Sequence, residues 1–161
     1  MKANEIMETK GVIDVLNDLI KLNRDRVEGY QKAREELEDG NRHIARTLID
    51  DRIQESHVFI NELTTAISGL DGFPEDTEST GGKLYRAWMG LKTSFTGGSS
   101  KSVLELCEYG EDVALKVYDA ALKGKTDWPE DILSTLSRQR MILEDAHDII
   151  KRNRDIERAR T

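Results

Sequence analysis

Two pairs of residues in this sequence have the spacing of metal ligands on a helix. Glu144 stands three residues before His147, and Gln54 stands three residues before His57. Side chains three positions apart lie on the same face of an α-helix, so a carboxylate and an imidazole spaced in this way can bind one metal ion together. Carboxylates and imidazoles that hold two metal ions can support oxygen or peroxide chemistry.

A two-metal centre between helices needs more ligands than these pairs supply. Bundles that hold two iron ions present a Glu on each of two helices and a Glu-x-x-His pair on each of the other two. Gln54 stands where an acid belongs, and helical periodicity places no Glu at the centre of an inward face. We therefore expect an incomplete di-iron site, although a π-bulge would turn the residues beyond it by about 100° and could bring Glu144 inward. The candidate metal ligands are Glu28, His57, Glu111, Glu144 and His147.

Polar residues of another kind fall near the middle of the inward faces. They are Asn23, Arg52, Ser56 and Gln139. We expect them to form a buried polar layer in the place where a metal would lie, with Arg52 paired to Glu111, because neither charge is stable alone inside a protein. The alternative is that Arg52 extends to solvent and that the other side chains bond to nearby backbone groups.

The remaining residues with reactive potential favour structural roles. The single cysteine, Cys107, falls on an inward helix face and is predicted to be a small buried apolar residue rather than a nucleophile. It has no partner for an internal disulfide, which fits a reducing compartment. The glycine pairs Gly81-Gly82 and Gly97-Gly98 are not followed, in the right frame, by the Lys-Ser or Lys-Thr of a phosphate-binding loop, so they are predicted to be hinges.

The elements that must position these residues are long helices. Apolar residues recur at steps of three, four and seven, few Val, Ile or Thr residues alternate with polar ones, and only two prolines interrupt the chain. This pattern predicts an all-α protein with helices at residues 10–39, 41–70, 102–123 and 129–155.

The lengths of the links predict how these helices are connected. The first and third links are short, which makes the helices that they join antiparallel neighbours. Roughly 30 residues separate the second helix from the third, enough to run the length of a bundle. One long crossover in a four-helix bundle is the ferritin-like topology. We expect a single domain at residues 1–161, with the crossover at 71–100 and a charged end at 151–161.

The crossover itself is predicted to carry a short helix at about residues 83–95. Its apolar stripe consists of Leu84, Trp88, Leu91 and Phe95. This stripe could cover the bundle, or it could bind a second copy of the chain and form a homodimer. A change of elution volume with concentration in size-exclusion chromatography would support the dimer.

Composition excludes several classes of partner. The 161 residues are 37% hydrophobic and 34% charged, with a net charge of −7. An acidic protein is repelled by nucleic acids and anionic membranes, so neither is expected as a partner. The polar segment 1–10 does not resemble a signal peptide, and no stretch approaches the roughly 20 apolar residues of a membrane span. We expect a cytoplasmic protein.

Four segments carry a resemblance to a known family. They are VLNDLIKLNRDRVEGYQKA (15–33), GGKLYRAWMGLKTSFTGG (81–98), CEYGEDVALKVYDAAL (107–122) and AHDIIKRNRD (146–155). In these segments the chain resembles a bacterial family of ferritin-like four-helix-bundle proteins of unknown function. The resemblance implies a ferritin-like fold and no particular reaction.

Two functions remain open at this point. The first is a non-catalytic bundle, an interaction or stress-associated protein of the bacterial cytoplasm, for which no cofactor is expected. The alternative is a ferritin-like protein that binds iron or another divalent metal through Glu111, Glu144 and His147, with Glu28 and His57 as further ligands, and performs oxygen or peroxide chemistry.

Overall fold

Four helices make up nearly all of the part of the chain that the structure describes. The computed structural model describes residues 3–37, 43–74 and 100–159. Its helices are α1 (Ala3–Glu36), α2 (His43–Gly69), α4 (Ser100–Lys123) and α5 (Glu130–Ala159). The predicted crossover helix, with Leu84, Trp88, Leu91 and Phe95, lies outside the described residues.

Helix boundaries differ from the predicted ones mainly at the two ends of the chain. Helix α1 begins at Ala3 rather than at residue 10, and α5 continues to Ala159 rather than ending at 155. Both extensions are rich in polar residues, which continue a helix without adding to its apolar stripe. Periodicity therefore cannot detect them.

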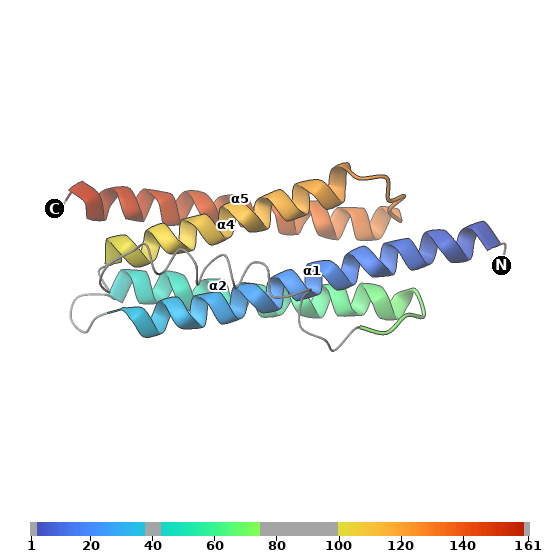
Figure 1. Ribbon diagram of the computed structural model, residues 1–161, viewed down its shortest axis with the longest axis horizontal. Coiled ribbons are helices and arrows are strands. Elements are labelled where there is room, and N and C mark those ends of the chain that lie inside the picture. The colour runs from blue at the N-terminus through green and yellow to red at the C-terminus, as the bar shows by residue number, and fades with distance from the viewer. Residues whose placement is uncertain (1–2, 38–42, 75–99, 160–161) are drawn as a thin grey trace.

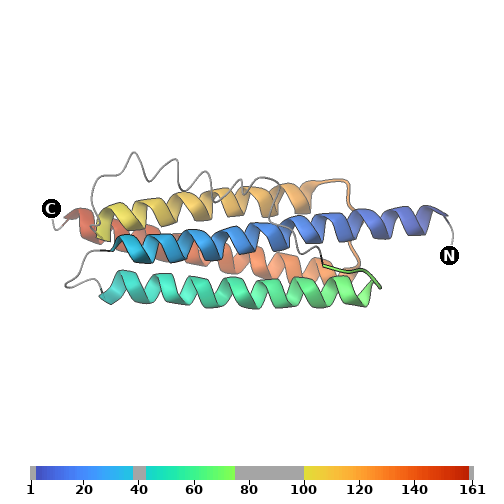
Figure 2. The same cartoon turned by 60° about the horizontal axis from the view of Figure 1, so that its bottom comes forward.

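The four helices lie lengthwise against one another (Figures 1 and 2). Helix α1 contacts α2 and α4, and α5 contacts α4 and α2. Figure 1 shows α2 and α4 beginning at the end of the bundle where α1 and α5 finish, so each helix is antiparallel to both of its neighbours. Because α2 ends at one end of the bundle and α4 begins at the other, the topology is the predicted ferritin-like one.

Local hydrogen bonds form at the end of α2 and at the beginning of α5. After α2, the N–H of Gly72 donates to the carbonyl of Ile67 at 3.0 Å, and Asp71 adopts a left-handed conformation with φ of 60°. Before α5, the carbonyl of Pro129 accepts from Leu133 N–H at 2.9 Å. The indole of Trp128 donates to the carbonyl of Ala121, which ties the α4–α5 link to α4.

The interior contains a continuous apolar core that polar side chains interrupt near its middle. Completely or almost completely buried apolar residues include Leu16, Leu19, Ile20, Ile49, Phe59, Leu63, Ile67, Leu104, Ala114, Leu136, Leu143 and Ile150. Equally buried polar residues are Asn23, Arg26, Ser56, Glu111 and Gln139. Within residues 3–37, 43–74 and 100–159, no helix is both long and apolar enough to cross a membrane.

Candidate functional site

An arginine from α1 occupies the centre of the bundle. Arg26 is completely buried, and its guanidinium donates to Glu111 Oε1 on α4 through Nε at 3.2 Å and Nη2 at 2.9 Å. It also donates to Glu55 Oε1 on α2 at 3.1 Å and to Asn23 Oδ1 on its own helix at 3.1 Å. A buried charge is stable only when it is paired and hydrogen-bonded, so these contacts join three helices around one cation.

Glu111 is the acceptor on which this centre converges. Its Oε1 atom also accepts a hydrogen bond from the hydroxyl of Tyr30. The guanidinium carbon of Arg26 lies 5.9 Å from the ring centroid of Tyr30 and 5.7 Å from that of Phe59, within the range of cation–π attraction. The other carboxylate oxygen of Glu111, Oε2, is buried and has no hydrogen-bond partner in the part of the chain that the structure describes.

A second set of hydrogen bonds carries the network to the fourth helix. The hydroxyl of Tyr118 on α4 donates to Gln139 Oε1 on α5 at 2.7 Å and accepts from Asn23 Nδ2 at 3.0 Å. The amide nitrogen of Gln139 donates to Glu62 Oε1 on α2 at 3.2 Å. Because Asn23 also binds Arg26, the two sets form one network that reaches all four helices.

Burial sets the protonation of the groups in this network. It raises the pKa of Tyr30, which the negative charge of Glu111 raises further, and it raises the pKa of Tyr118. Both hydroxyls therefore remain protonated donors at neutral pH. Burial is the largest single effect on the pKa of Arg26 and would lower it, but Glu111, Tyr30 and Glu55 together outweigh burial and the pKa rises. Burial also raises the pKa of Glu55, against the opposing effect of Arg26.

The buried thiol on α4 is held in its protonated form as well. Cys107 is completely buried beside the network. Burial is the main cause that raises the pKa of its thiol, and the charge of Glu111 adds to the effect. A buried, protonated thiol is a poor nucleophile and a poor metal ligand, which agrees with a structural role.

The predicted polar layer lies partly where it was expected. Asn23, Ser56 and Gln139 are completely buried, and the Ser56 hydroxyl donates to the backbone carbonyl of Arg52 at 2.8 Å. The predicted pair of Arg52 with Glu111 is wrong. The Arg52 side chain is 13% exposed and lies 3.5 Å from Glu55, while Arg26 is the partner of Glu111.

The burial of Arg26 was not predicted, although the sequence contains a signal for it. Arg26 and Tyr30 follow Asn23 by three and seven residues, which places all three on one face of α1. Because Asn23 was predicted to face inward, the same spacing predicts an inward position for Arg26 as well.

The predicted metal ligands do not come together. Glu28, His57 and Glu144 are exposed, and the Glu144 carboxylate accepts from Arg140 at 2.5 Å. Glu111 is occupied by Arg26. Of the five predicted ligands, only His147 belongs to a group whose ligand atoms are close enough to hold one ion. The other members of that group were not among the predicted ligands.

This group consists of Glu108 and Asp112 on α4 and His147 on α5, with ligand atoms all within 4.8 Å of one another. Among the described residues it is the one group of three such side chains. Glu108, which was not among the predicted ligands, faces α5, where it lies close to His147 and Arg154. Its spacing of four residues from Asp112 was the available signal, since residues four apart share a helix face.

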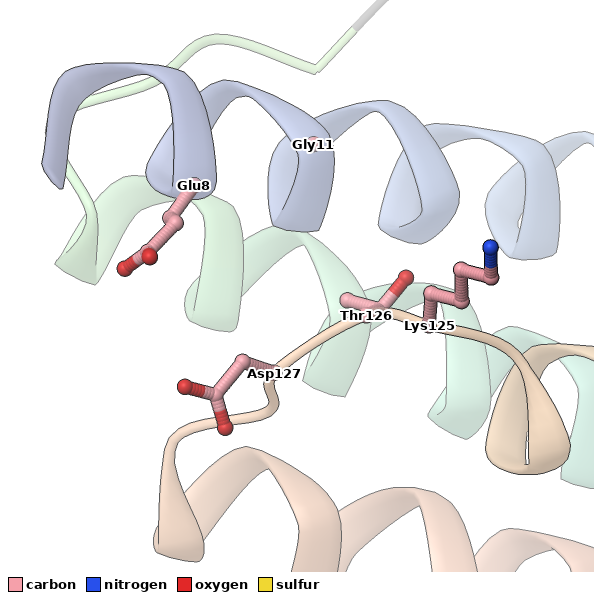
Figure 3. A pocket seen from close by; sticks show the side chains of 5 residues that line it. All are labelled: Glu8, Gly11, Lys125, Thr126 and Asp127. Carbon is pink, nitrogen blue, oxygen red and sulfur yellow. The ribbon is translucent and has the colours of Figure 1, made fainter. Parts of the chain in front are cut away.

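A separate recess lies at the end of the bundle where α1 begins. Glu8 and Gly11 of α1 line it together with Lys125, Thr126 and Asp127 of the α4–α5 link, around a volume of about 350 Å³ (Figure 3). The recess contains neither histidine nor cysteine and shares no residue with the buried network. The recess therefore offers no support for metal binding.

Comparisons with known proteins agree with this fold. A family described as "Domain of unknown function (DUF2383)" matches residues 11–124. A solved structure titled "Crystal structure of ferritin like, diiron-carboxylate proteins from Bacillus anthracis str. Ames" is similar with a TM-score of 0.58 and 13% identity, covering 99% of this chain and 98% of the other. At this identity the likeness concerns the fold alone. None of the curated proteins matches the sequence.

Proposed function

The chain belongs to the family of the domain of unknown function DUF2383, and from this premise we propose that it is a non-catalytic, ferritin-like binding protein whose central metal site has been replaced by Arg26. Arg26 then fills the centre of the bundle in place of a metal, and the surface of the bundle is the part that binds a protein partner.

The residues at mid-bundle do not fit the two iron ions that the similar structure's title names. A di-iron centre of this kind takes four carboxylates and two histidines from four helices. Here the carboxylates of Glu55 and Glu111 are both hydrogen-bonded to Arg26, and α5 contributes the uncharged Gln139. A metal ion would have to displace a guanidinium that is buried among its own acceptors.

The observation that carries the proposal is the complete burial of Arg26 against Glu111. Arginine stays protonated in proteins and performs no redox chemistry. A bundle with this internal cation has a charge-compensated interior without a metal, so its centre serves the structure and its surface is left for function. Exposed apolar side chains, such as Val58 at 53% and Met141 at 63%, offer contacts for a protein partner.

Iron oxidation by the purified protein tests whether Arg26 fills the centre in place of a metal. The protein is mixed with Fe(II) without oxygen, exposed to air, and the formation of Fe(III) is followed by absorbance. We expect Fe(II) to be oxidised at the same rate with the parent, with Glu111→Gln and in the protein-free control. Oxidation that depends on the parent protein and is lost in Glu111→Gln, but retained in the exposed variant Glu144→Gln, would overturn the proposal.

Metal binding, the alternative function predicted from the sequence, retains one observation in its favour. Glu108, Asp112 and His147 offer two carboxylates and an imidazole on the flank between α4 and α5. This position is compatible with a charged arginine at the centre, because the two groups share no ligand. A role in stress and a location in the bacterial cytoplasm stay predictions.

A further inference from the structure

We propose that Glu108, Asp112 and His147 bind a single divalent transition-metal ion, of which Zn²⁺ is the best probe, on the flank of the bundle. The site uses no residue of α1 or α2, and it is distinct from the mid-bundle position of a di-iron centre. It goes beyond the proposed function, since a flank ion and the central arginine are compatible and either can be absent without the other.

The distances between the ligand atoms suit such an ion. His147 Nε2 lies 2.7 Å from Asp112 Oδ1 and 3.7 Å from Glu108 Oε1. A tetrahedral zinc ion with bonds of about 2.0–2.1 Å separates its ligand atoms by about 3.3 Å. These two distances lie on either side of this separation, and side-chain movements of about half an ångström would bring both to it.

Contacts behind the ligands orient them. The second ring nitrogen of His147, Nδ1, lies 3.2 Å from Asp148 Oδ1. If Nδ1 carries the ring proton and donates it there, the Nε2 lone pair points to the site, which is the usual carboxylate–histidine–metal arrangement. Arg154 donates to Glu108 Oε2, and this contact turns the other oxygen, Oε1, towards His147.

Charge and exposure favour a cation with an open position. Glu108 and Asp112 contribute two negative charges, of which Arg154 compensates part, and the neutral imidazole contributes none. The side chains of Glu108 and His147 are 12% and 17% exposed, whereas that of Asp112 is 48% exposed. Three protein ligands with one side open to solvent leave the fourth position for water, as in many zinc sites.

The competing explanation is an ion pair without metal, in which a protonated His147 binds Asp112 directly. Titration calorimetry of the full chain with ZnCl₂, in a buffer that does not bind metals, separates the two. We expect about one Zn²⁺ per chain for the parent, with affinity at least about tenfold weaker in Asp112→Asn and in His147→Ala. Two matched controls, His57→Ala on α2 and Glu144→Gln on α5, should keep the parent affinity.

Folding of the variants is checked by circular dichroism before titration, and Asp112→Asn is the mildest change because Asp112 is half exposed. Co²⁺ provides a second readout, since absorption bands of a four-coordinate ion should appear in the parent and not in His147→Ala. No saturable Zn²⁺ binding by the parent, or equal weakening in the His57 control, would overturn the proposal. Neither result would bear on iron oxidation at the bundle centre, which Glu111→Gln tests separately.

Discussion

At the scale of single residues, Arg26 illustrates how a charge can be stable without water. Its donors reach a carboxylate of α2, a carboxylate of α4 and an amide of α1, and two aromatic rings lie over its guanidinium. Removing one partner of a buried ion pair is costly because the other charge remains desolvated. When Arg26 is replaced, the cost therefore arises at Glu111, whose carboxylate stays buried without its counter-charge.

The change Arg26→Met should lower the free energy of unfolding by about 3–5 kcal/mol, since Glu111 would remain buried without its counter-charge. Urea denaturation at neutral pH measures the effect. The matched control is Arg52→Met, whose guanidinium makes one contact of 3.5 Å with Glu55 and has a buried Nε without a partner in the described residues. Its cost should be about 1 kcal/mol or less. Equal losses in both variants would contradict the assignment of Arg26 as the partner of Glu111.

At the scale of helices, buried tyrosines connect elements that the apolar core alone would leave less precisely aligned. Tyr30 joins α1 to α4 through Glu111, and Tyr118 joins α4 to α5 through Gln139 and to α1 through Asn23. Such bonds specify a rotation and a height for each helix, because a shift of one residue would separate donor from acceptor. The ion pair of Arg140 with Asp119 adds a partly exposed α4–α5 contact and lowers the pKa of Asp119.

These tyrosines predict a loss of stability in alkali. Their pKa values are raised in the folded protein, chiefly by burial, so their contribution is fully present below the ordinary tyrosine pKa of about 10 and is lost as the pH rises above it. Above that pH, each tyrosine can lower the free energy of unfolding by up to about 1.4 kcal/mol per pH unit. Urea denaturation at several pH values between about 9 and 11 measures this loss. The free energy of unfolding should fall less steeply with pH in Tyr118→Phe than in the parent. The half-exposed Tyr109→Phe is the control, and an unchanged slope in Tyr118→Phe would refute the role of Tyr118.

At the scale of the whole molecule, self-association through the crossover stays a prediction. The stripe formed by Leu84, Trp88, Leu91 and Phe95 lies outside the described residues, so it is the test in solution that decides. Light scattering coupled to size-exclusion chromatography should show the mass rising from one chain towards two with concentration. Trp88→Lys should abolish this rise, whereas Met141→Lys on the exposed face of α5 should not. If the parent remains a monomer at the highest concentration, the predicted homodimer is ruled out.

The sequence by itself determined the helices and their connection. The spacing of apolar residues and the scarcity of prolines are local signals, which show where a helix forms and which face it buries. Link lengths then restricted the topology to one with a single long crossover, because a short link permits only antiparallel neighbours. The polar character of Asn23 and Gln139 at inward positions was also readable, since it follows from the same periodicity.

Only the tertiary structure decided which polar residues meet. Arg26 and Glu111 are 85 residues apart in sequence, and their contact depends on the relative heights of α1 and α4, which periodicity does not contain. Each helix in the bundle faces two neighbours, so its buried face is wider than one stripe, and residues such as Glu108 lie at a contact between helices rather than in water. A long side chain such as that of arginine adds reach that a helical projection cannot represent. For these reasons the sequence predicted a polar layer, and the packing of the helices determined that a cation from α1 occupies its centre.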